Sequence, residues 1–170
     1  RHRLRARAIG LRISYSRRLG NESRPDGSGI VARRLGQRHF AKLSALLKPG
    51  GHACVQSIVI DDALFDRYVR STDFIQQYIF PGGCLPSPSQ FRAQAAAAGL
   101  VVVDEFAFGQ DYAQTCKLWR EKFLAERTQV LQLGFDERFV RIWEFYLSYC
   151  EAAFARRNTD VVQYTLRKPD

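Results

Sequence analysis

The chain has 170 residues, which is enough for one domain with a sizeable buried core. Its net charge of +9, from 26 lysines and arginines against 17 acidic residues, taken whole favours nucleic acid or an anionic membrane as a partner. The excess is confined to residues 1–40, which hold eleven arginines and two acidic residues, while the other 130 residues are neutral overall. Residues 1–38 offer one aromatic ring, Tyr15, for stacking on bases, so we expect no nucleic-acid partner.

The basic start of the chain has no clear structural period. Leucines and isoleucines are scattered through residues 1–20, and residues 21–29 have the composition of a loop. We therefore expect residues 1–38 to be a basic arm that is disordered or translated from a shifted reading frame. Residues 39–170 are expected to form the folded part.

Helices and strands are expected to alternate from residue 39 onward. Apolar residues at helical spacing begin at Phe40 and end before Pro49, and the β-rich run Ala53–Ile60 fits a buried strand. Asp61 and Asp62 then begin a helix with carboxylates in its first turn.

The segment Phe74–Phe91 is unusual because a sharp turn lies between aromatic and aliphatic residues. Pro81 fixes its own φ, and Gly82 and Gly83 can adopt positive φ. An apolar loop that bends sharply often touches a ligand or covers a cavity. A buried strand edge followed by a turn is the alternative.

The remaining elements follow from caps and periodicity. Ser87 is placed as the N-cap of a helix that has Pro88 at its first position and ends at Gly99. The expected elements are a helix over Pro88–Ala98, a strand over Leu100–Phe108, helices over Asp111–Leu133 and Asp136–Arg157, and a strand over Asp160–Leu166.

The last of these helices carries a broad apolar and aromatic face at i, i+3, i+4 spacing. Its members are Phe139, Ile142, Trp143, Tyr146, Tyr149, Cys150, Ala153 and Phe154. Such a stripe is usually ordinary core. Its aromatic density, with Trp119 and Phe123, also suits the wall of an apolar tunnel.

Several segments resemble one family in order along the chain. They are LLKPGG at Leu46–Gly51, VQSIVI at Val55–Ile60, FIQQYIFPGGCLPSPSQF at Phe74–Phe91, VVVDEFAFGQDYAQT at Val101–Thr115, GFDERFVRIWEFYLSYCEAAF at Gly134–Phe154 and RNTDVVQYTL at Arg157–Leu166. Over residues 40–169 the chain resembles the C-terminal half of the cyclopropane-fatty-acyl-phospholipid synthase family. The YIFPGGCLPS and FGQDY motifs carry this resemblance, whereas LKPGG recurs across many methyltransferases.

The resemblance implies an α/β fold, namely the C-terminal half of a Rossmann-like class I methyltransferase whose last two strands pair antiparallel. It implies an S-adenosylmethionine-dependent enzyme that methylenates or methylates double bonds of unsaturated phospholipid acyl chains. In this family the methyl transfer leaves a carbocation, and a bound bicarbonate removes the proton that closes the ring. The resemblance also implies a cytoplasmic protein that works at the inner face of the membrane.

The resemblance also suggests site residues. Gln56, in VQSI, and Tyr112, in FGQDY, occupy bicarbonate-binding positions, and Cys150 matches a cysteine near the active site. The shared-site hypothesis requires these three side chains to converge on one cavity near the turn at residues 80–83. The residues expected to contact the lipid are Tyr78, Phe80, Gly82, Gly83, Trp119 and Tyr146. Gln56 and Tyr112 could each instead be ordinary core residues.

Part of the family pattern is missing from the chain. It shows no glycine-rich cofactor loop, no ribose-binding carboxylate and no counterpart of the glutamate that also holds bicarbonate, so we expect the chain alone to bind S-adenosylmethionine weakly and to be inactive. Its cysteines and histidines match no metal-site spacing. The alternative is a non-catalytic lipid- or membrane-binding half-domain with a basic arm.

Overall fold

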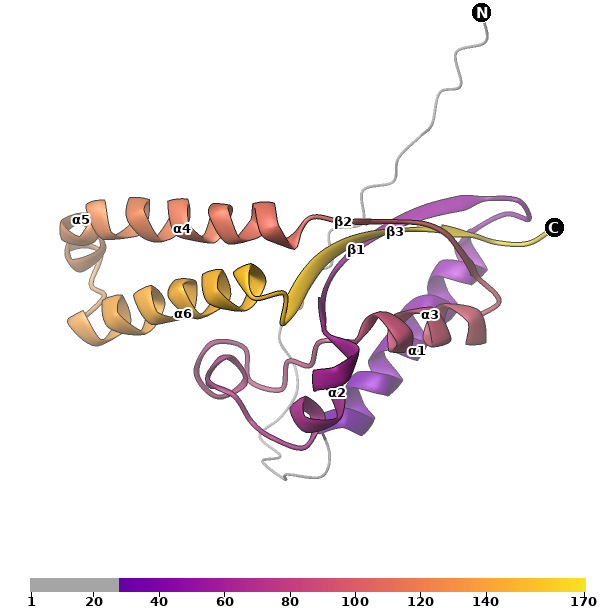
Figure 1. The fold of residues 1–170 in the computed structure, drawn as a ribbon, viewed down its shortest axis with the longest axis horizontal. Coiled ribbons are helices and arrows are strands. Elements are labelled where there is room, and N and C mark those ends of the chain that lie inside the picture. The colour runs from indigo at the N-terminus through magenta and orange to yellow at the C-terminus, as the bar shows by residue number, and fades with distance from the viewer. Residues whose placement is uncertain (1–27) are drawn as a thin grey trace, which may run out of the picture.

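The computed structural model describes residues 28–170, with side chains from Gln37 onward. Figure 1 shows a small sheet with helices packed beneath it and a long helical hairpin that projects from one end of the sheet. Residues 1–27 of the expected basic arm lie outside the described residues. The first helix, α1 (Ser28–Leu46), includes the expected boundary at residue 38.

The sheet has three strands, β1 (His52–Ile60), β2 (Val101–Ala107) and β3 (Thr159–Arg167), in the order β1-β3-β2. The central strand β3 runs antiparallel to both neighbours, which places Gln56 opposite Gln163. The three expected strands are thus present within a residue or two of their expected ends, and the antiparallel pairing of the last two strands is confirmed.

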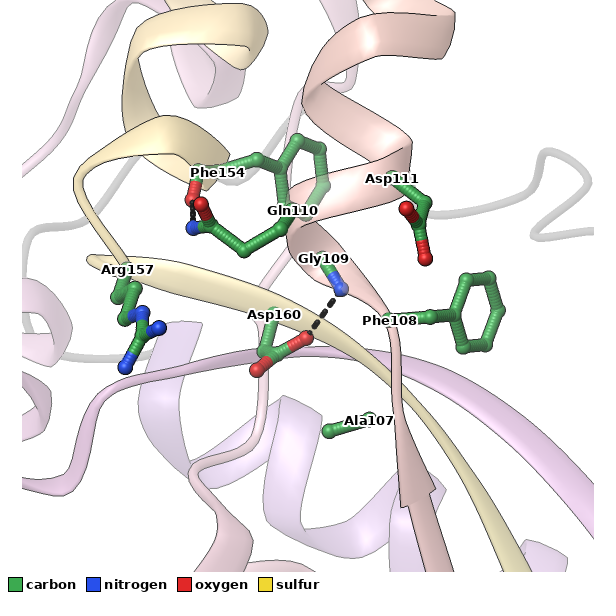
Figure 2. Close-up of a pocket in the computed structure, with 8 residues that line it drawn as sticks. All are labelled: Ala107, Phe108, Gly109, Gln110, Asp111, Phe154, Arg157 and Asp160. Carbon is green, nitrogen blue, oxygen red and sulfur yellow. Dashed lines mark hydrogen bonds between the residues drawn. The ribbon is translucent and has the colours of Figure 1, made fainter.

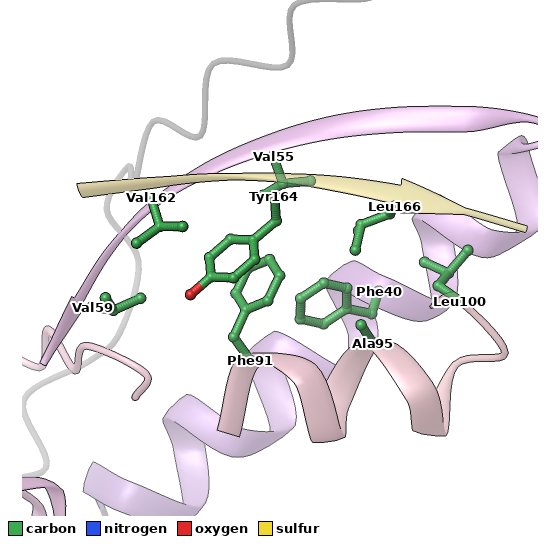
Figure 3. Packing of buried hydrophobic residues seen from close by; sticks show 9 residues of the cluster. All are labelled: Phe40, Val55, Val59, Phe91, Ala95, Leu100, Val162, Tyr164 and Leu166. Atoms are coloured by element: carbon green, nitrogen blue, oxygen red, sulfur yellow. The ribbon is translucent and has the colours of Figure 1, made fainter. Parts of the chain in front are cut away.

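One face of the sheet is covered by α1 and by α3 (Pro88–Ala97). Figure 3 shows Phe91 of α3 under Tyr164, where the two rings stack with centroids 3.8 Å apart, and Phe40 meets Phe91 edge-on at 5.0 Å. The expected caps of α3 are confirmed, because Ser87 Oγ accepts from the backbone of Gln90 and Pro88 is the first helical residue. This cluster is the main core of the described chain.

The opposite face of the sheet is mostly open in the described part of the chain. Ile58 of β1 is 38% exposed, and Phe106 of β2 is 59% exposed. Because side chains alternate along a strand, Cys54 and Gln56 share this face with Ile58. The edge of β1 that points away from β3 has no partner strand among residues 28–170.

The segment Phe74–Phe91, which follows α2 (Asp62–Val69), does not begin with the buried strand edge that was the alternative expectation. Residues Ile75–Ile79 form a short π-helix, closed by a bond from the Phe80 amide to the Ile75 carbonyl. Asp73 and Gln76 cap its start reciprocally, each side chain accepting from the other's backbone amide. Gly82 then adopts φ +79°, so the expected sharp turn is present.

The helical hairpin consists of α4 (Gly109–Ala125), α5 (Arg127–Gln132) and α6 (Glu137–Ala155). The single helix expected over Asp111–Leu133 is therefore wrong, since the chain bends at Glu126, whose φ and ψ are −92° and 13°. The bend and the turn after α5 reverse the chain, so that α6 packs along α4 (Figure 1).

Candidate functional site

A groove of about 520 Å³ lies between α4 and α6, beside the turn that follows the π-helix. Its lining is mainly apolar and aromatic. The lining residues are Phe80, Trp119, Lys122, Phe123, Glu126, Trp143, Tyr146 and Leu147. This volume lies within the range of small-molecule binding sites.

The aromatic rings of the groove contact one another in sequence. Trp143 lies 5.2 Å from Tyr146 between ring centroids, and Phe80 approaches Tyr146 edge-on at 6.0 Å. Trp119 approaches from α4 and is 50% exposed. Because rings can present their faces to a hydrocarbon chain without unpaired polar atoms, this wall suits an acyl chain.

Half of the residues expected to contact lipid line this groove, namely Phe80, Trp119 and Tyr146. Gly82 and Gly83 belong to the adjacent turn and do not line it, and Tyr78 is half exposed and packs on Phe74. Phe74 in turn meets Phe145 of α6 edge-on at 4.6 Å, which attaches the π-helix to the hairpin.

The aromatic wall, including Trp143, is indicated by the spacing of apolar residues along α6. Leu147, Lys122 and Glu126 were not predicted, because a periodic apolar stripe shows which face of a helix is inward but not where a groove interrupts the packing.

Tyr112 and Cys150 are brought together near the base of the hairpin. Both pack against the buried cluster that contains Cys116 and Phe154, and the Tyr112 ring lies 5.1 Å from the Phe154 ring. Trp119 lies edge-on to Tyr112 at 5.7 Å, so this cluster is continuous with the groove.

Burial keeps the ionisable groups of this cluster neutral. Burial raises the pKa of Tyr112, and the nearby thiols of Cys116 and Cys150 raise it further. Burial also raises the pKa of Cys150 to about 12, with a further contribution from Cys116. Tyr112 is therefore a phenol that can donate a hydrogen bond, and the Cys150 thiol is not a thiolate nucleophile at neutral pH.

Gln56 does not belong to this cluster. It is exposed on the open face of the sheet, where its Oε1 accepts a hydrogen bond of 3.0 Å from Gln163 Nε2. The two regions are linked by rings, since Phe106, the strand partner of Gln163, stacks on Phe108, which lies 6.4 Å from Tyr112. Convergence of Gln56 with Tyr112 and Cys150 on one cavity stays a prediction.

A second, smaller pocket of about 290 Å³ lies where β3 begins beside the start of α4. Asp160 is one of its lining residues, and Figure 2 shows the hydrogen bond that Asp160 Oδ1 accepts from the Gly109 amide, which is 2.7 Å long. The same oxygen accepts from the Val161 amide at 2.8 Å, and Gln110 Nε2 donates to the Phe154 carbonyl at 2.9 Å. Asp160 thus caps α4 and fixes the helix turn that carries Tyr112.

The role of Asp160 could not be predicted from the sequence, because it caps a helix that is distant along the chain. An N-cap residue normally lies directly before its helix, whereas Asp160 lies 51 residues after Gly109. The available signal was Gly109 itself, since a Cβ there would lie 2.5 Å from Asp160 Oδ1. A glycine directly after a strand indicates close approach by another group.

The described residues do not fit the nucleotide of S-adenosylmethionine. The turn from β1 into α2 is formed by Asp61, which caps that helix, and the start of α4 is occupied by the Asp160 carboxylate. Neither turn is glycine-rich, in contrast to the cofactor-binding turn of Rossmann folds. No group of three or more potential metal ligands is present among the described residues, and no described helix is long and apolar enough to cross a bilayer.

Residues 31–164 match the family model described as mycolic acid cyclopropane synthetase. The tuberculostearic acid methyltransferase UfaA1 of Mycobacterium tuberculosis is 42% identical over 130 residues, which cover 76% of this chain and 30% of that protein. The cyclopropane-fatty-acyl-phospholipid synthase of Escherichia coli is 40% identical over 125 residues, which cover 74% of this chain and 31% of that protein. The chain thus spans less than a third of these two relatives.

Solved structures of cyclopropane synthases share the fold of this chain. The cyclopropane synthase MmaA2 from Mycobacterium tuberculosis superposes with a TM-score of 0.71 at 23% identity, covering 80% of this chain and 50% of that one. The mycolic acid cyclopropane synthase CmaA1 complexed with SAH and CTAB also gives a TM-score of 0.71, at 26% identity, covering 79% of this chain and 50% of that one. The fold class expected from the sequence is confirmed.

Proposed function

The chain belongs to the mycolic acid cyclopropane synthetase family, as its motifs predicted, and we propose that it supplies the lipid-binding side of an S-adenosylmethionine-dependent methyltransferase. The substrate is an unsaturated phospholipid whose acyl chain lies in the groove between α4 and α6. The whole enzyme methylenates or methylates the double bond of that chain at a membrane surface. The observation that carries the proposal is the aromatic groove of about 520 Å³ beside Tyr112.

The groove supports this substrate through its lining. Burial of each methylene contributes roughly 0.8 kcal/mol, so an apolar channel of this size favours a hydrocarbon chain over a polar substrate. The faces of Trp119, Trp143 and Tyr146 also carry negative potential, which stabilises positive charge that develops on a reacting carbon.

The role proposed for Tyr112 is to donate a hydrogen bond to a bound bicarbonate. Its raised pKa keeps the phenol protonated, and its place beside the groove puts that donor next to an apolar channel. The role of Gln56 as a second donor depends on covering the open sheet face, because the side chain is exposed among the described residues.

The cofactor proposal comes from the relatives rather than from the described residues. The UfaA1 relative is named a methyltransferase, and the CmaA1 structure contains SAH. Since neither described turn is glycine-rich and each is capped by an aspartate, we propose that another part of the enzyme supplies that site. The absence of a glycine-rich cofactor loop from the described turns also favours the second candidate, a lipid-binding half-domain without catalysis.

The two tryptophans of the chain, Trp119 and Trp143, both line the groove, so their fluorescence reports on it directly. The test is a titration with a phospholipid whose double bonds have been brominated, kept below its critical micelle concentration. We expect the bromines to quench both tryptophans, as judged with Trp119→Phe and Trp143→Phe. Absence of quenching would refute the groove assignment.

A matched control uses Phe106→Ser on the open face of the sheet, where the side chain is 59% exposed. Quenching should be unchanged in this variant. Calorimetry with S-adenosylmethionine tests a point that both candidates share, because this chain is expected to bind the cofactor weakly in either case. Low-micromolar affinity would show that the chain forms the cofactor site by itself and would exclude the non-catalytic candidate.

A further inference from the structure

The far end of the helical hairpin exposes large apolar side chains. Leu133, after α5, is 77% exposed, and Phe135, before α6, is 47% exposed. Figure 1 shows this end of the hairpin pointing away from the sheet and from the other helices. We call residues 131–136 the hairpin tip. An apolar tip on a projecting element is a candidate interaction surface.

A continuous row of rings connects the tip with the groove. Phe135 stacks on Phe139 at 4.3 Å, and Phe139 stacks on Trp143 at 5.7 Å. Trp143 in turn lies 5.2 Å from Tyr146 in the groove. The exposed apolar surface of the tip and the groove wall are therefore parts of one surface along α6.

Charged residues flank the tip. Arg127 and Glu137 form an ion pair at the base of the tip, and Arg138 is exposed on the first turn of α6. The carboxylate of Asp136, at the end of the tip, accepts a hydrogen bond from the Phe139 amide and caps α6. Long basic side chains can stay in the headgroup layer while neighbouring apolar residues enter the acyl region. Charged side chains around the small apolar surface of the tip fit a membrane interface.

We propose that the hairpin tip docks on a phospholipid bilayer, with Leu133 and Phe135 inserted below the headgroups. The inference rests on the proposed function, because the row of rings then leads an acyl chain from the bilayer to the groove. A protein partner fits less well, since a stable protein interface buries about 800 Å² on each side, and the tip presents only two large apolar side chains. Two such side chains give weak and reversible docking.

The test is sedimentation of the full chain with vesicles of saturated phosphatidylcholine in high salt. Saturated lipid has no double bond, neutral headgroups offer no net charge, and high salt screens the arginine-rich residues 1–40. We expect the wild type to bind and the Leu133→Ser, Phe135→Ser double variant to bind about tenfold more weakly or worse.

Two controls separate the tip from other apolar surface. Phe106→Ser removes an equally large side chain from the open sheet face, and Leu46→Ser removes a leucine that is 68% exposed at the end of α1. Both variants should bind vesicles like the wild type. The single variant Leu133→Ser, at the most exposed position, should also weaken binding and guards against a folding defect from the loss of the Phe135–Phe139 stack.

Three results would overturn the proposal. They are no vesicle binding by the wild type in high salt, an equal loss of binding in Phe106→Ser, and full binding by the double variant. The groove titration uses monomeric lipid and needs no bilayer, so its outcome is independent of vesicle docking. Failure of docking with an intact groove would therefore remove the tip assignment alone.

Discussion

Replacing Gly109 with alanine should destabilise the hairpin, because Asp160 already occupies the space that the new methyl group needs. The Cβ would lie 2.5 Å from Asp160 Oδ1 and 3.0 Å from its Cα. The carboxylate must therefore move, and the bonds of 2.7 Å and 2.8 Å from the Gly109 and Val161 amides are lost or lengthened. The start of α4 then loses its cap.

The size of the effect follows from these two causes. Overpacking typically costs about 1–3 kcal/mol, and loss of a hydrogen bond to a charged group costs about 1.5–3 kcal/mol. One displacement of Asp160 produces both effects, so they overlap, and we expect a loss of about 2–4 kcal/mol in the free energy of unfolding. Urea denaturation measures this as a lower midpoint with an unchanged slope.

A double-mutant cycle isolates the contact. In an Asp160→Ala background the closest atom is gone, so Gly109→Ala should cost clearly less than it does in the wild type. Asp160→Asn keeps the acceptor oxygen, so we expect it to lower the free energy of unfolding only slightly. If Gly109→Ala unfolds at the wild-type urea concentration, the start of α4 is not held by Asp160 and the argument for the placement of Tyr112 is wrong.

Three further predictions concern the core, the pH dependence and the site. Phe91→Ala should lower the free energy of unfolding by about 3–5 kcal/mol, because the side chain is 3% exposed and stacks on Tyr164. Phe106→Ala should lower it by less than about 1 kcal/mol. Equal losses in the two variants, measured by urea denaturation, would contradict the assigned core. Because burial raises the pKa of Cys150 from its ordinary 9.0 to about 12, its contribution to stability is complete below pH 9.0 and is lost as the pH rises towards 12. The melting temperature should therefore decrease less with pH over this range in Cys150→Ser than in the wild type. An equal decrease in both proteins would refute the raised pKa of Cys150. In the full-length enzyme, Tyr112→Phe should reduce turnover on unsaturated phospholipid more than it weakens cofactor binding, and Gln56→Ala should do the same. Full turnover in both folded variants would refute the bicarbonate-binding role of these residues.

The elements with strong local signals could be predicted from the sequence. Ser87 and Pro88 mark the start of α3 because a side-chain cap and a fixed φ act within three residues. The strand Ala53–Ile60 was visible as a β-rich run and is present as His52–Ile60. Such signals do not depend on the rest of the fold.

The features that depend on tertiary packing could not be predicted. The bend at Glu126 lies among good helix formers, and it is favoured by the return of α6 along α4 rather than by the local sequence. The π-helix after Phe74 arises where aromatic residues pack on α6. The separation of Gln56 from the Tyr112 cluster likewise depends on which face of the sheet is covered, which strand periodicity alone does not give.

Photo-crosslinking tests most directly whether the groove between α4 and α6 holds an acyl chain. The probe is an unsaturated phospholipid with a diazirine near the middle of one acyl chain, and the labelled residues are mapped by mass spectrometry after irradiation. The account predicts labels on groove residues such as Trp119, Trp143 and Tyr146, and their loss on competition with unlabelled lipid. Labels concentrated instead on the open sheet face, around Phe106, with the groove unlabelled, would contradict it.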